Sequence, residues 1–426
     1  MKKSFKRLGL GVLAGVLLVG LAACGGSKDG KAGEGKTDFK GDTLKIGVWG
    51  GNEAEEKSLD ELIKNFETET GAKVDKKVYT DYNTQMQTDL VGKTAPDVFY
   101  VDASMYPFFQ SQGALAPLDK KEFESDKFYS TLIDTFSTDG EMYAAPKDFS
   151  TLALYLNTEI FEKTGVSVDE VPASYEEMVT WLPGFQEKID KAYGKGKVSA
   201  MSYNPEMSRN LHIAQRDGGA IEDKDGRSTL SDKKVVDNFS ILNDLVATKG
   251  FVTPQDIGAG WNGEAFGTGK LAMMEEGNWV YQNLNNDYKD IKYTVKPMQT
   301  YKGEKGSMMF SVGWGKYSGT KQSDLADKWI KYVTGKEGME LWVTGTGTLP
   351  SREDVAESAK IADNKDMKVH LDAWEYATPW QKGVSLTTID NAFKNFVPKA
   401  LDGSMSMEEA MKKADEQANA DIDAGK

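Results

Sequence analysis

The apolar residues of segment 43–71 change their spacing once, from every second position to every third or fourth. In "TLKIGVW", Leu44, Ile46 and Val48 alternate with polar or small residues, which is typical of a β-strand. Two glycines end the strand, and four apolar residues then recur at helical spacing: Leu59, Leu62, Ile63 and Phe66. The segment therefore predicts a strand followed by an amphipathic helix, which Gly71 ends.

The alternation of strands and helices continues as far as residue 101. We expect a strand at 74–79, a helix at 82–91 and an apolar strand at 98–101. A β-α-β-α-β order of this kind predicts a mainly parallel sheet with helices on both faces. The fold class is therefore expected to be α/β.

Local signals predict further elements in the rest of the chain. The dipeptide Asp139-Gly140 favours a hairpin turn, and an alternating strand follows at 152–156. Helical patterns dominate 175–248, and another amphipathic helix is expected at 323–333. We find no internal repeat.

A basic and apolar leader precedes these elements. Four positive residues come first, and the apolar run 8–23 is too short and too rich in Gly and Ala for a typical membrane span. This order is typical of an export signal. The tetrad "LAAC" ends at Cys24, the only cysteine of the chain, and resembles the lipobox of bacterial lipoproteins, whose cysteine takes a diacylglyceryl group. The alternatives are a secretory signal with an unrelated cysteine, or an uncleaved membrane anchor.

The polar stretch after Cys24 favours the lipobox. Residues 25–40, "GGSKDGKAGEGKTDFK", are typical of a flexible tether between an anchor and a folded body. We therefore predict a signal peptide at 1–23, a lipidated Cys24 and a tether at 24–41. Because two acyl chains hold a protein firmly to a membrane, we expect an extracytoplasmic protein on the cell membrane, of the Gram-positive surface type.

Composition then limits the possible functions. About 385 residues remain after the tether, which is enough for two large domains. The formal net charge is −14 and the leader is basic, so the mature body is acidic and would be repelled by nucleic acids. His212 and His370 are the only histidines, which disfavours most zinc and triad chemistry. We expect no metal site, no cofactor and no nucleic-acid partner, although carboxylates alone could still hold calcium.

Six phrases in a fixed order give the chain a resemblance to a known family. They are the lipobox, "LKIGVWGG", "APDVFYVDASMYPFFQSQGALAPLD", "DGEMYAAPKD" with "LYLN", "AFGTGKLAMMEEGNW" and "VTGKEGMELWVTGTGTLPSRED". Together they resemble the bacterial extracellular solute-binding proteins of ABC importers, in the carbohydrate-binding family that includes maltodextrin receptors. The resemblance implies a two-lobed, periplasmic-binding-protein-like fold, with the ligand cleft between the lobes and closure about a hinge.

The resemblance also implies domain boundaries. The N-terminal lobe would hold residues 42–148 and 312–349, and the C-terminal lobe residues 149–311 and 350–426. Three crossing segments would form the hinge: Lys147–Thr151, Phe310–Gly313 and Thr348–Arg352.

Seven residues would line the cleft according to the same resemblance: Trp49, Asp102, Asp148, Trp261, Trp279, Trp314 and Trp380. An aromatic ring can cover the apolar face of a sugar, and a carboxylate accepts strong hydrogen bonds from its hydroxyl groups. Trp49 and Asp102 are also favoured independently, because each ends a predicted strand of an α/β sheet. Each tryptophan could instead pack in a core. After Asp102 the chain reads "ASMYPF" and departs from the maltodextrin receptors, so maltose itself is not implied.

Three functional hypotheses remain open. The first is a monomeric, non-enzymatic receptor that captures a sugar, in the first place an oligosaccharide, and delivers it to an ABC permease. The second is a surface lipoprotein glycosidase, whose two carboxylates would lie about 5 Å or about 6.5 to 9.5 Å apart. The third keeps the receptor fold but takes a non-sugar ligand. A phosphorylated ligand would need basic residues, and the predicted cleft edge offers only Lys147 and Arg352.

Overall fold

The computed structural model describes residues 38–425, which belong to the unit Thr37–Lys426. The predicted signal peptide, Cys24 and most of the predicted tether lie outside the described residues. Phe39, which the tether prediction included, is 4% exposed and packs in a hydrophobic core, so the folded body begins before residue 42. Among residues 38–425, no helix is long and apolar enough to cross a membrane.

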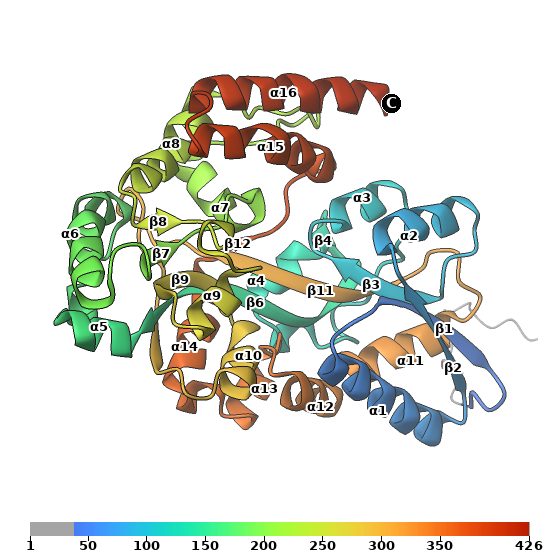
Figure 1. The fold of residues 1–426 in the computed structure, drawn as a ribbon. Coiled ribbons are helices and arrows are strands. Elements are labelled where there is room, and N and C mark those ends of the chain that lie inside the picture. Colours follow the sequence, from blue (N-terminus) through green and yellow to red (C-terminus); the bar gives the residue numbers. More distant parts are fainter. Residues whose placement is uncertain (1–37, 426) are drawn as a thin grey trace, which may run out of the picture. The chain divides into compact units, whose positions relative to one another are not determined.

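The first part of the fold follows the predicted β-α-β-α-β order (Figure 1). It comprises β1 (Thr43–Trp49), α1 (Glu53–Thr70), β2 (Lys73–Tyr79), α2 (Tyr82–Val91) and β3 (Val98–Asp102). Strand β1 pairs in parallel with both β2 and β3. Helix α1 begins at a capping box formed by Asn52 and Glu55, and it ends at Gly71 in the left-handed region, with φ of 71°. These elements confirm the sequence prediction for this part.

One mixed sheet runs through the folded body. Its strand order is β2-β1-β3-β11-β6-β9-β7-β8, while β10 pairs with β6 and β12 with β11. The additional strands are β6 (Ala144–Asn157), β7 (Ser199–Ser202), β8 (Phe251–Val252), β9 (Leu271–Gly277), β10 (Tyr293–Lys296), β11 (Met308–Lys316) and β12 (Thr378–Pro379). The sheet is parallel in its outer parts, but β11 and β6 at its centre run antiparallel to their neighbours in this order.

The predicted hairpin joins β4 (Ser137–Thr138) to β5 (Glu141–Met142). Asp139 and Gly140 both have positive φ, 52° and 86°, which the two-residue turn of a tight hairpin requires. The turn prediction is confirmed.

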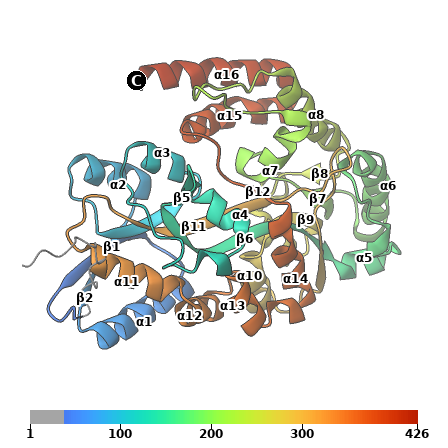
Figure 2. The ribbon, with the colours of Figure 1, turned by 180° about the vertical axis from the view of Figure 1, so that it is seen from behind.

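Helices cover both faces of the sheet (Figures 1 and 2). Beside the first strands, α1 packs with α11 (Ser323–Thr334) and α12 (Lys336–Thr346), while α2 and α3 (Tyr106–Ser111) lie on the opposite side. The second part carries α6 (Tyr175–Tyr193), α7 (Met207–Ala214), α8 (Lys233–Ala247), α15 (Leu386–Leu401) and α16 (Met407–Ala424). The other α-helices are α4 (Ser130–Thr135), α5 (Thr158–Thr164), α9 (Asn262–Gly267), α10 (Val280–Asp287), α13 (Glu353–Ser358) and α14 (Lys365–Asp372).

Two large hydrophobic cores lie on the two parts of the sheet. The first combines side chains of β1, β3, α1, α11 and α12, and the second combines side chains of β7, α6, α7, α8, α15 and α16. Strand β6 contributes to both, because Ala144 and Ala145 pack in the first core and Leu152, Leu154 and Leu156 in the second. The long central strand therefore connects two separate cores.

Three segments that are far apart in the sequence lie side by side at the centre of the sheet. In β6, Phe149 pairs with Ser311 of β11, and it exchanges two backbone hydrogen bonds with Leu349, with N···O distances of 3.1 and 3.3 Å. A smaller hydrophobic cluster surrounds them and includes Phe149, Met309 and Leu349. These are the segments that the resemblance assigns to the crossings.

Candidate functional site

A row of side chains crosses the centre of the sheet, and we call it the central row. Val312 of β11 is in register with Asp102 of β3 on one side and with Asp148 of β6 on the other. Phe310 pairs with Ser150 and, because alternate residues of a strand share a face, lies on the same side as Val312. Except for the buried Asp148, these side chains are partly exposed, although most of their strand neighbours are buried. The central row is therefore a candidate floor for a ligand site.

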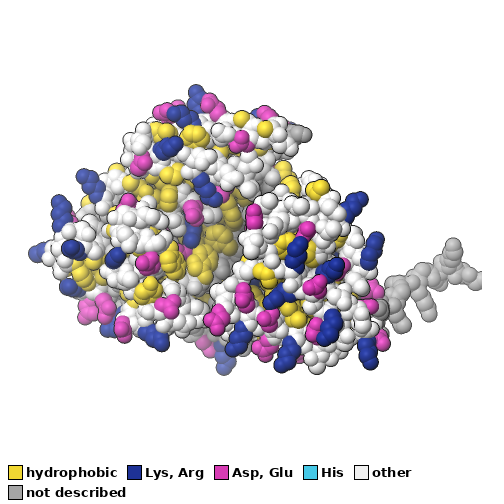
Figure 3. Space-filling view, turned by 45° about the vertical axis from the view of Figure 1, so that its right-hand side comes forward, with side chains coloured by type: hydrophobic (Ala, Val, Ile, Leu, Met, Phe, Trp, Pro, Cys, Tyr) yellow, Lys and Arg dark blue, Asp and Glu magenta, His cyan; other side chains and the backbone are white. Residues whose placement is uncertain are grey.

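Trp279 lies beside the central row. It comes two residues after the end of β9, its side chain is 38% exposed, and its ring meets that of Phe310 edge-on at a centroid distance of 5.6 Å. The ring lies over Gly277, where a Cβ atom would clash with it. A glycine is therefore required beneath this ring, and part of the indole stays open to a ligand. The surface also shows a hollow with hydrophobic side chains along its walls (Figure 3).

Arg209, a further neighbour of Trp279, is held in place by an ion pair with Glu276. Arg209 of α7 places its Cζ 5.1 Å from the centroid of the indole ring, and its Nη1 lies 2.6 Å from Oε1 of Glu276. Glu276 is 1% exposed, and the same oxygen accepts the N–H of Gly277 at 3.0 Å. One buried carboxylate thus orients both the guanidinium and the turn that carries Trp279.

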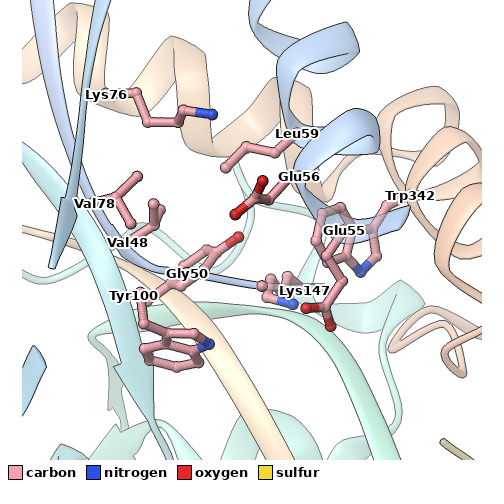
Figure 4. A pocket seen from close by; sticks show the side chains of 12 residues that line it. Val48, Gly50, Glu55, Glu56, Leu59, Lys76, Val78, Tyr100, Lys147 and Trp342 are labelled. Atoms are coloured by element: carbon pink, nitrogen blue, oxygen red, sulfur yellow. The ribbon is translucent and has the colours of Figure 1, made fainter. Parts of the chain in front are cut away.

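Trp49 lines a small pocket at the carboxyl end of β1 (Figure 4). The pocket is also lined by Tyr100, Trp342 and two carboxylates from the first turn of α1, Glu55 and Glu56. Trp49 is partly exposed and contacts the ring of Tyr100 at a centroid distance of 4.8 Å. Because only a short glycine-containing connection separates β1 from α1, aromatic rings and hydrogen-bond acceptors meet at the strand end.

Asp148 lies next to this pocket, and its carboxylate already has two partners. Its Oδ2 is 2.5 Å from Nζ of Lys147 and accepts the indole N–H of Trp342 at 2.8 Å. Lys147 and Asp148 are each 7% exposed, and the ammonium lies 4.1 Å from the centroid of the Trp342 ring. Asp148 therefore links the indole of Trp342, a residue of the first core, to the start of the crossing. Its other carboxylate oxygen, Oδ1, is the one that can serve a ligand.

Asp102 ends β3 at the central row. Its Oδ1 accepts the backbone N–H of Ser104 at 2.8 Å and also the hydroxyl of that residue. Burial raises the pKa of this carboxyl above its ordinary value, while the two bonds from Ser104 oppose the shift. Asp102 is thus a carboxyl group that can exchange hydrogen bonds with hydroxyl groups.

Trp314 lies in the first core, not at the surface. It is 2% exposed, and its ring contacts Tyr100 and Trp329 at centroid distances of 4.5 and 5.6 Å. Trp329 belongs to α11, which covers this end of β11. We do not carry Trp314 into the proposed site, because its ring has no face open to a ligand.

The other two tryptophans expected in the cleft have different surroundings. Trp261 precedes α9, is 37% exposed, and lies over Gly263, where a Cβ atom would clash with its ring. Trp380 is partly exposed, packs against the second core, and donates its backbone N–H to the carbonyl of Met309 at 2.8 Å. Trp380 is thus held beside β11 by a backbone hydrogen bond. Trp261, like Trp279, has a partly exposed ring that lies over a glycine.

Several residues in or near the central row were not among the predicted site residues: Tyr100, Arg209, Glu276, Phe310 and Trp342. The sequence contained a usable signal for Phe310, which begins a predicted crossing, and for Glu276, which stands directly before the Gly-Asn-Trp turn. Arg209 and Trp342 are far in sequence from Glu276 and Asp148, the residues that they contact. No spacing along the chain could have indicated them.

The two histidines do not form a reactive site. His212 and His370 are 2% and 1% exposed, and burial lowers their pKa values to about 3 and about 4. In His370, Nε2 lies 2.7 Å from the hydroxyl of Tyr155 and Nδ1 lies 2.8 Å from the carbonyl of Thr151, so this side chain joins α14 to β6. Within residues 38–425, no group of three or more His, Cys, Asp or Glu is arranged to hold a metal ion.

Comparison with known proteins places the chain in a family. The chain is similar to the diacetylchitobiose binding protein of Streptomyces coelicolor, with 26% identity over 363 residues and 81% of each chain covered. It is similar to the maltodextrin-binding protein of Bacillus subtilis, with 23% identity over 423 residues, 95% of this chain and 94% of that one. Among solved structures it resembles the GacH receptor of Streptomyces glaucescens, determined unliganded and with acarbose. Here the TM-score is 0.71, the identity 25%, and the coverage 88% of this chain and 97% of that one, which confirms the predicted fold class. Residues 61–369 match the family model described as bacterial extracellular solute-binding protein, and the chain belongs to this family.

Proposed function

We propose that this chain is the lipid-anchored substrate-binding component of an ABC importer, which captures a sugar and delivers it to a membrane permease. The observation that carries the proposal is the exposed ring of Trp279 beside a row that contains two carboxyl groups, Asp102 and Asp148. Two of the similar proteins are named for diacetylchitobiose and maltodextrin, which supports an oligosaccharide as the ligand. The receptor would act as a monomer without a cofactor and would catalyse no reaction.

The proposed contacts follow from the chemistry of a sugar ring. Trp279 would stack on the apolar face of one sugar unit, and Asp102 and the second oxygen of Asp148 would bond its hydroxyl groups. Trp49 would contact a neighbouring unit, because the strand end that carries it offers aromatic rings together with Glu55 and Glu56. Trp380 and Trp261 would extend the site.

The proposed cleft lies between two lobes that meet along the central row. The N-terminal lobe would hold residues 42–148 and 312–349, and the C-terminal lobe residues 149–311 and 350–426. The two separate cores support this division, and the three neighbouring segments around Phe149 and Leu349 are suited to a hinge. Closure would bring the pocket at Trp49 towards Trp279.

The anchor belongs to the same proposal. A chain with Cys24→Ala should be released from the membrane or remain as an uncleaved precursor, because it has no sulfur to take the diacylglyceryl group. Fractionation of the cells with a membrane-protein marker measures this. A mature, membrane-bound form of the variant would contradict the lipid anchor but would leave sugar binding untouched.

Titration of tryptophan fluorescence against a panel of mono- and oligosaccharides tests the ligand. We expect a saturable change with at least one oligosaccharide, since stacking alters the surroundings of the exposed indoles. The absence of binding to every sugar in the panel would contradict the receptor. Chromatography of the incubated oligosaccharides separates the receptor from the glycosidase, because cleavage products with turnover would overturn a purely binding function.

A further inference from the structure

Two strand ends meet along one edge of β11. The carbonyl of Met309 accepts the N–H of Trp380, directly after β12, at 2.8 Å. The carbonyl of Ser311 accepts the N–H of Ala103, directly after β3, at 3.0 Å. Because β12 runs parallel to β11 and β3 runs antiparallel to it, the carboxyl ends of β12 and β3 point towards each other. Two residues of a strand span about 7 Å, so this edge brings together two segments that are far apart in the sequence.

Each of these strand ends carries a residue of the proposed site. Asp102 is the last residue of β3 and belongs to the central row. Because Pro379 of β12 pairs with Met309, the next residues of the two strands lie on the opposite face of the sheet. These next residues are Trp380 and Phe310, and both pack against the second core. The ring of Trp380 is therefore on the face of the sheet that carries the central row.

The side chain of Gln381 bridges the junction between the two strand ends. Its Nε2 donates one hydrogen bond to the carbonyl of Ala103 at 2.9 Å and another to the carbonyl of Thr135 at 2.8 Å. Thr135 is the last residue of α4, and the final carbonyls of a helix have no partner within the helix. Both hydrogens of the amide are used in this way. Gln381 therefore ties the residue after Trp380 to the residue after Asp102.

The segment that follows Gln381 has attachments of its own. Oε1 of Glu222 accepts the backbone N–H groups of Val384 and Ser385 at 3.0 and 3.4 Å. Because these bonds do not involve Gln381, the segment should stay attached when the amide of Gln381 is removed. Such a removal should therefore loosen Trp380 without unfolding its surroundings.

We propose that Gln381 is a positioning residue of the sugar site. Its amide holds the ring of Trp380 at a set distance from the carboxyl group of Asp102, so that both groups reach the same ligand, and Gln381 itself does not contact the sugar. The inference rests on the proposed sugar-binding function and adds a residue that the resemblance did not imply. An indirect role of this kind means that Gln381 affects binding only as long as the ring of Trp380 is present.

A double-mutant cycle tests this dependence. Gln381→Met keeps the approximate size of the side chain but removes both N–H donors. Calorimetric titration with an oligosaccharide that binds the unaltered protein should show affinity about fivefold weaker for Gln381→Met and about tenfold weaker for Trp380→Ala. The double variant should also be about tenfold weaker, because the ring on which Gln381 acts is already absent. A double variant weakened by about fiftyfold would show independent effects and overturn the positioning role.

Two further variants separate positioning from other roles. Gln381→Glu keeps the length of the side chain and an acceptor oxygen, but a carboxylate has no hydrogen for the two carbonyls, so it should weaken binding at least as much as Gln381→Met. Full affinity of Gln381→Glu would mean that the two N–H bonds are not needed and would overturn the proposal. Gln417→Met, at an exposed position of α16 where the amide bonds Asp421 at 2.9 Å, is the matched control and should leave the affinity unchanged.

Fluorine NMR of protein labelled with a fluorinated tryptophan gives a measurement without ligand. The resonance of Trp380 is identified by its absence from the spectrum of Trp380→Phe. Gln381→Met should shift or broaden this resonance and leave that of Trp261 in place, since Trp261 lies over its own glycine. An unchanged Trp380 resonance would show that the position of the ring does not depend on Gln381, and it would overturn the proposal.

The remaining outcomes separate the inference from the proposed function. Unchanged binding by Trp380→Ala would overturn the inference, because the ring would lie outside the site, but it would leave sugar binding standing. Failure of all sugars to bind the unaltered protein would overturn both. If Gln381→Met does not fold, Gln381→Glu gives the same cycle, and failure of both variants to fold would assign Gln381 to the stability of the fold and overturn the positioning role.

Discussion

Trp279 and Trp314 have the same side chain, and one contacts β11 while the other belongs to it, but their surroundings are opposite. Trp279 is 38% exposed and lies over a glycine, with one ring, that of Phe310, edge-on beside it. Trp314 is 2% exposed and lies between Tyr100 and Trp329. Their positions along the sheet explain the difference, because α11 covers the end of β11 that carries Trp314. At Trp279, helix α7 contributes the guanidinium of Arg209 beside the ring, and the ring stays partly exposed.

The comparison shows how a binding surface differs from a core in the same sheet. A buried tryptophan packs against neighbouring apolar side chains, and this packing stabilises the folded state, so its removal lowers the free energy of unfolding. A tryptophan on a glycine-containing turn keeps one face of its ring exposed. It contributes little to the stability of the ligand-free protein, but it contributes to the binding free energy when a ligand stacks on that face. Four substitutions can break or sharpen this contrast.

The largest effect is expected from Trp314→Ala. Removal of a buried indole should lower the free energy of unfolding by about 3 to 5 kcal/mol, since the cavity cannot be refilled. Urea unfolding measures this loss, and the sugar affinity per folded molecule should stay near that of the unaltered protein. A variant that is as stable as the unaltered protein but binds sugar weakly would show that Trp314 belongs to the binding site and not to the core.

Trp279→Ala should produce the opposite pair of results. Loss of a stacking anchor worth about 2 kcal/mol predicts binding that is about 30-fold weaker, with almost no change in the thermal midpoint of the ligand-free protein. Fluorescence no longer reports on this ring, so calorimetric titration is the measurement. If the variant is less stable without ligand but binds sugar with unchanged affinity per folded molecule, Trp279 is not part of the site.

Gly277→Ala tests the turn beneath the ring. The new methyl group would clash with the indole of Trp279 and tilt it, so we expect binding that is about tenfold weaker, or about 1.4 kcal/mol. Gly184→Ala in α6 is the matched control, because its Cβ atom would have no neighbour within 4 Å. Unchanged affinity in the first variant would mean that the ring does not need its present position.

The smallest effect concerns Glu275, two residues before Gly277. Burial raises the pKa of this carboxyl to about 7, against an ordinary value of 4.5, while bonds from Tyr175 and the charge of Arg209 oppose the shift. The folded protein therefore holds a proton that the unfolded chain has lost. Its contribution to stability is complete below pH 4.5 and disappears as the pH rises through 7.

Glu275→Gln should remove this dependence, because an amide cannot ionise but can still accept the hydroxyl hydrogen of Tyr175. Thermal midpoints between pH 5 and pH 8 should fall less steeply in the variant, while sugar affinity at pH 7 stays the same. A variant with the same pH profile as the unaltered protein would show that Glu275 is not the titrating group.

The first five elements of the fold could be read from the sequence, because their signals are local. The spacing of Leu59, Leu62 and Phe66 puts one face of α1 into the core, and Gly71 ends the helix in a conformation that glycine adopts easily. The turn at Asp139-Gly140 has the same local character. Each of these choices depends only on residues within one or two turns of the chain.

The resemblance supplied the candidates for the site, but the tertiary structure decided their surroundings. It separated Trp279 from Trp314, supplied Arg209 and Glu276 as neighbours of the exposed ring, and gave Asp148 its bonds to Lys147 and Trp342. It also placed β11 between β3 and β6, although long stretches of sequence separate it from both. Hydrophobic spacing fixes which face of an element is buried, whereas contacts between distant segments depend on how whole elements pack. For this reason the sequence by itself determined the α/β elements and the presence of suitable side chains, and only the packing of the two cores around the central row decided which of those side chains remain open to a ligand.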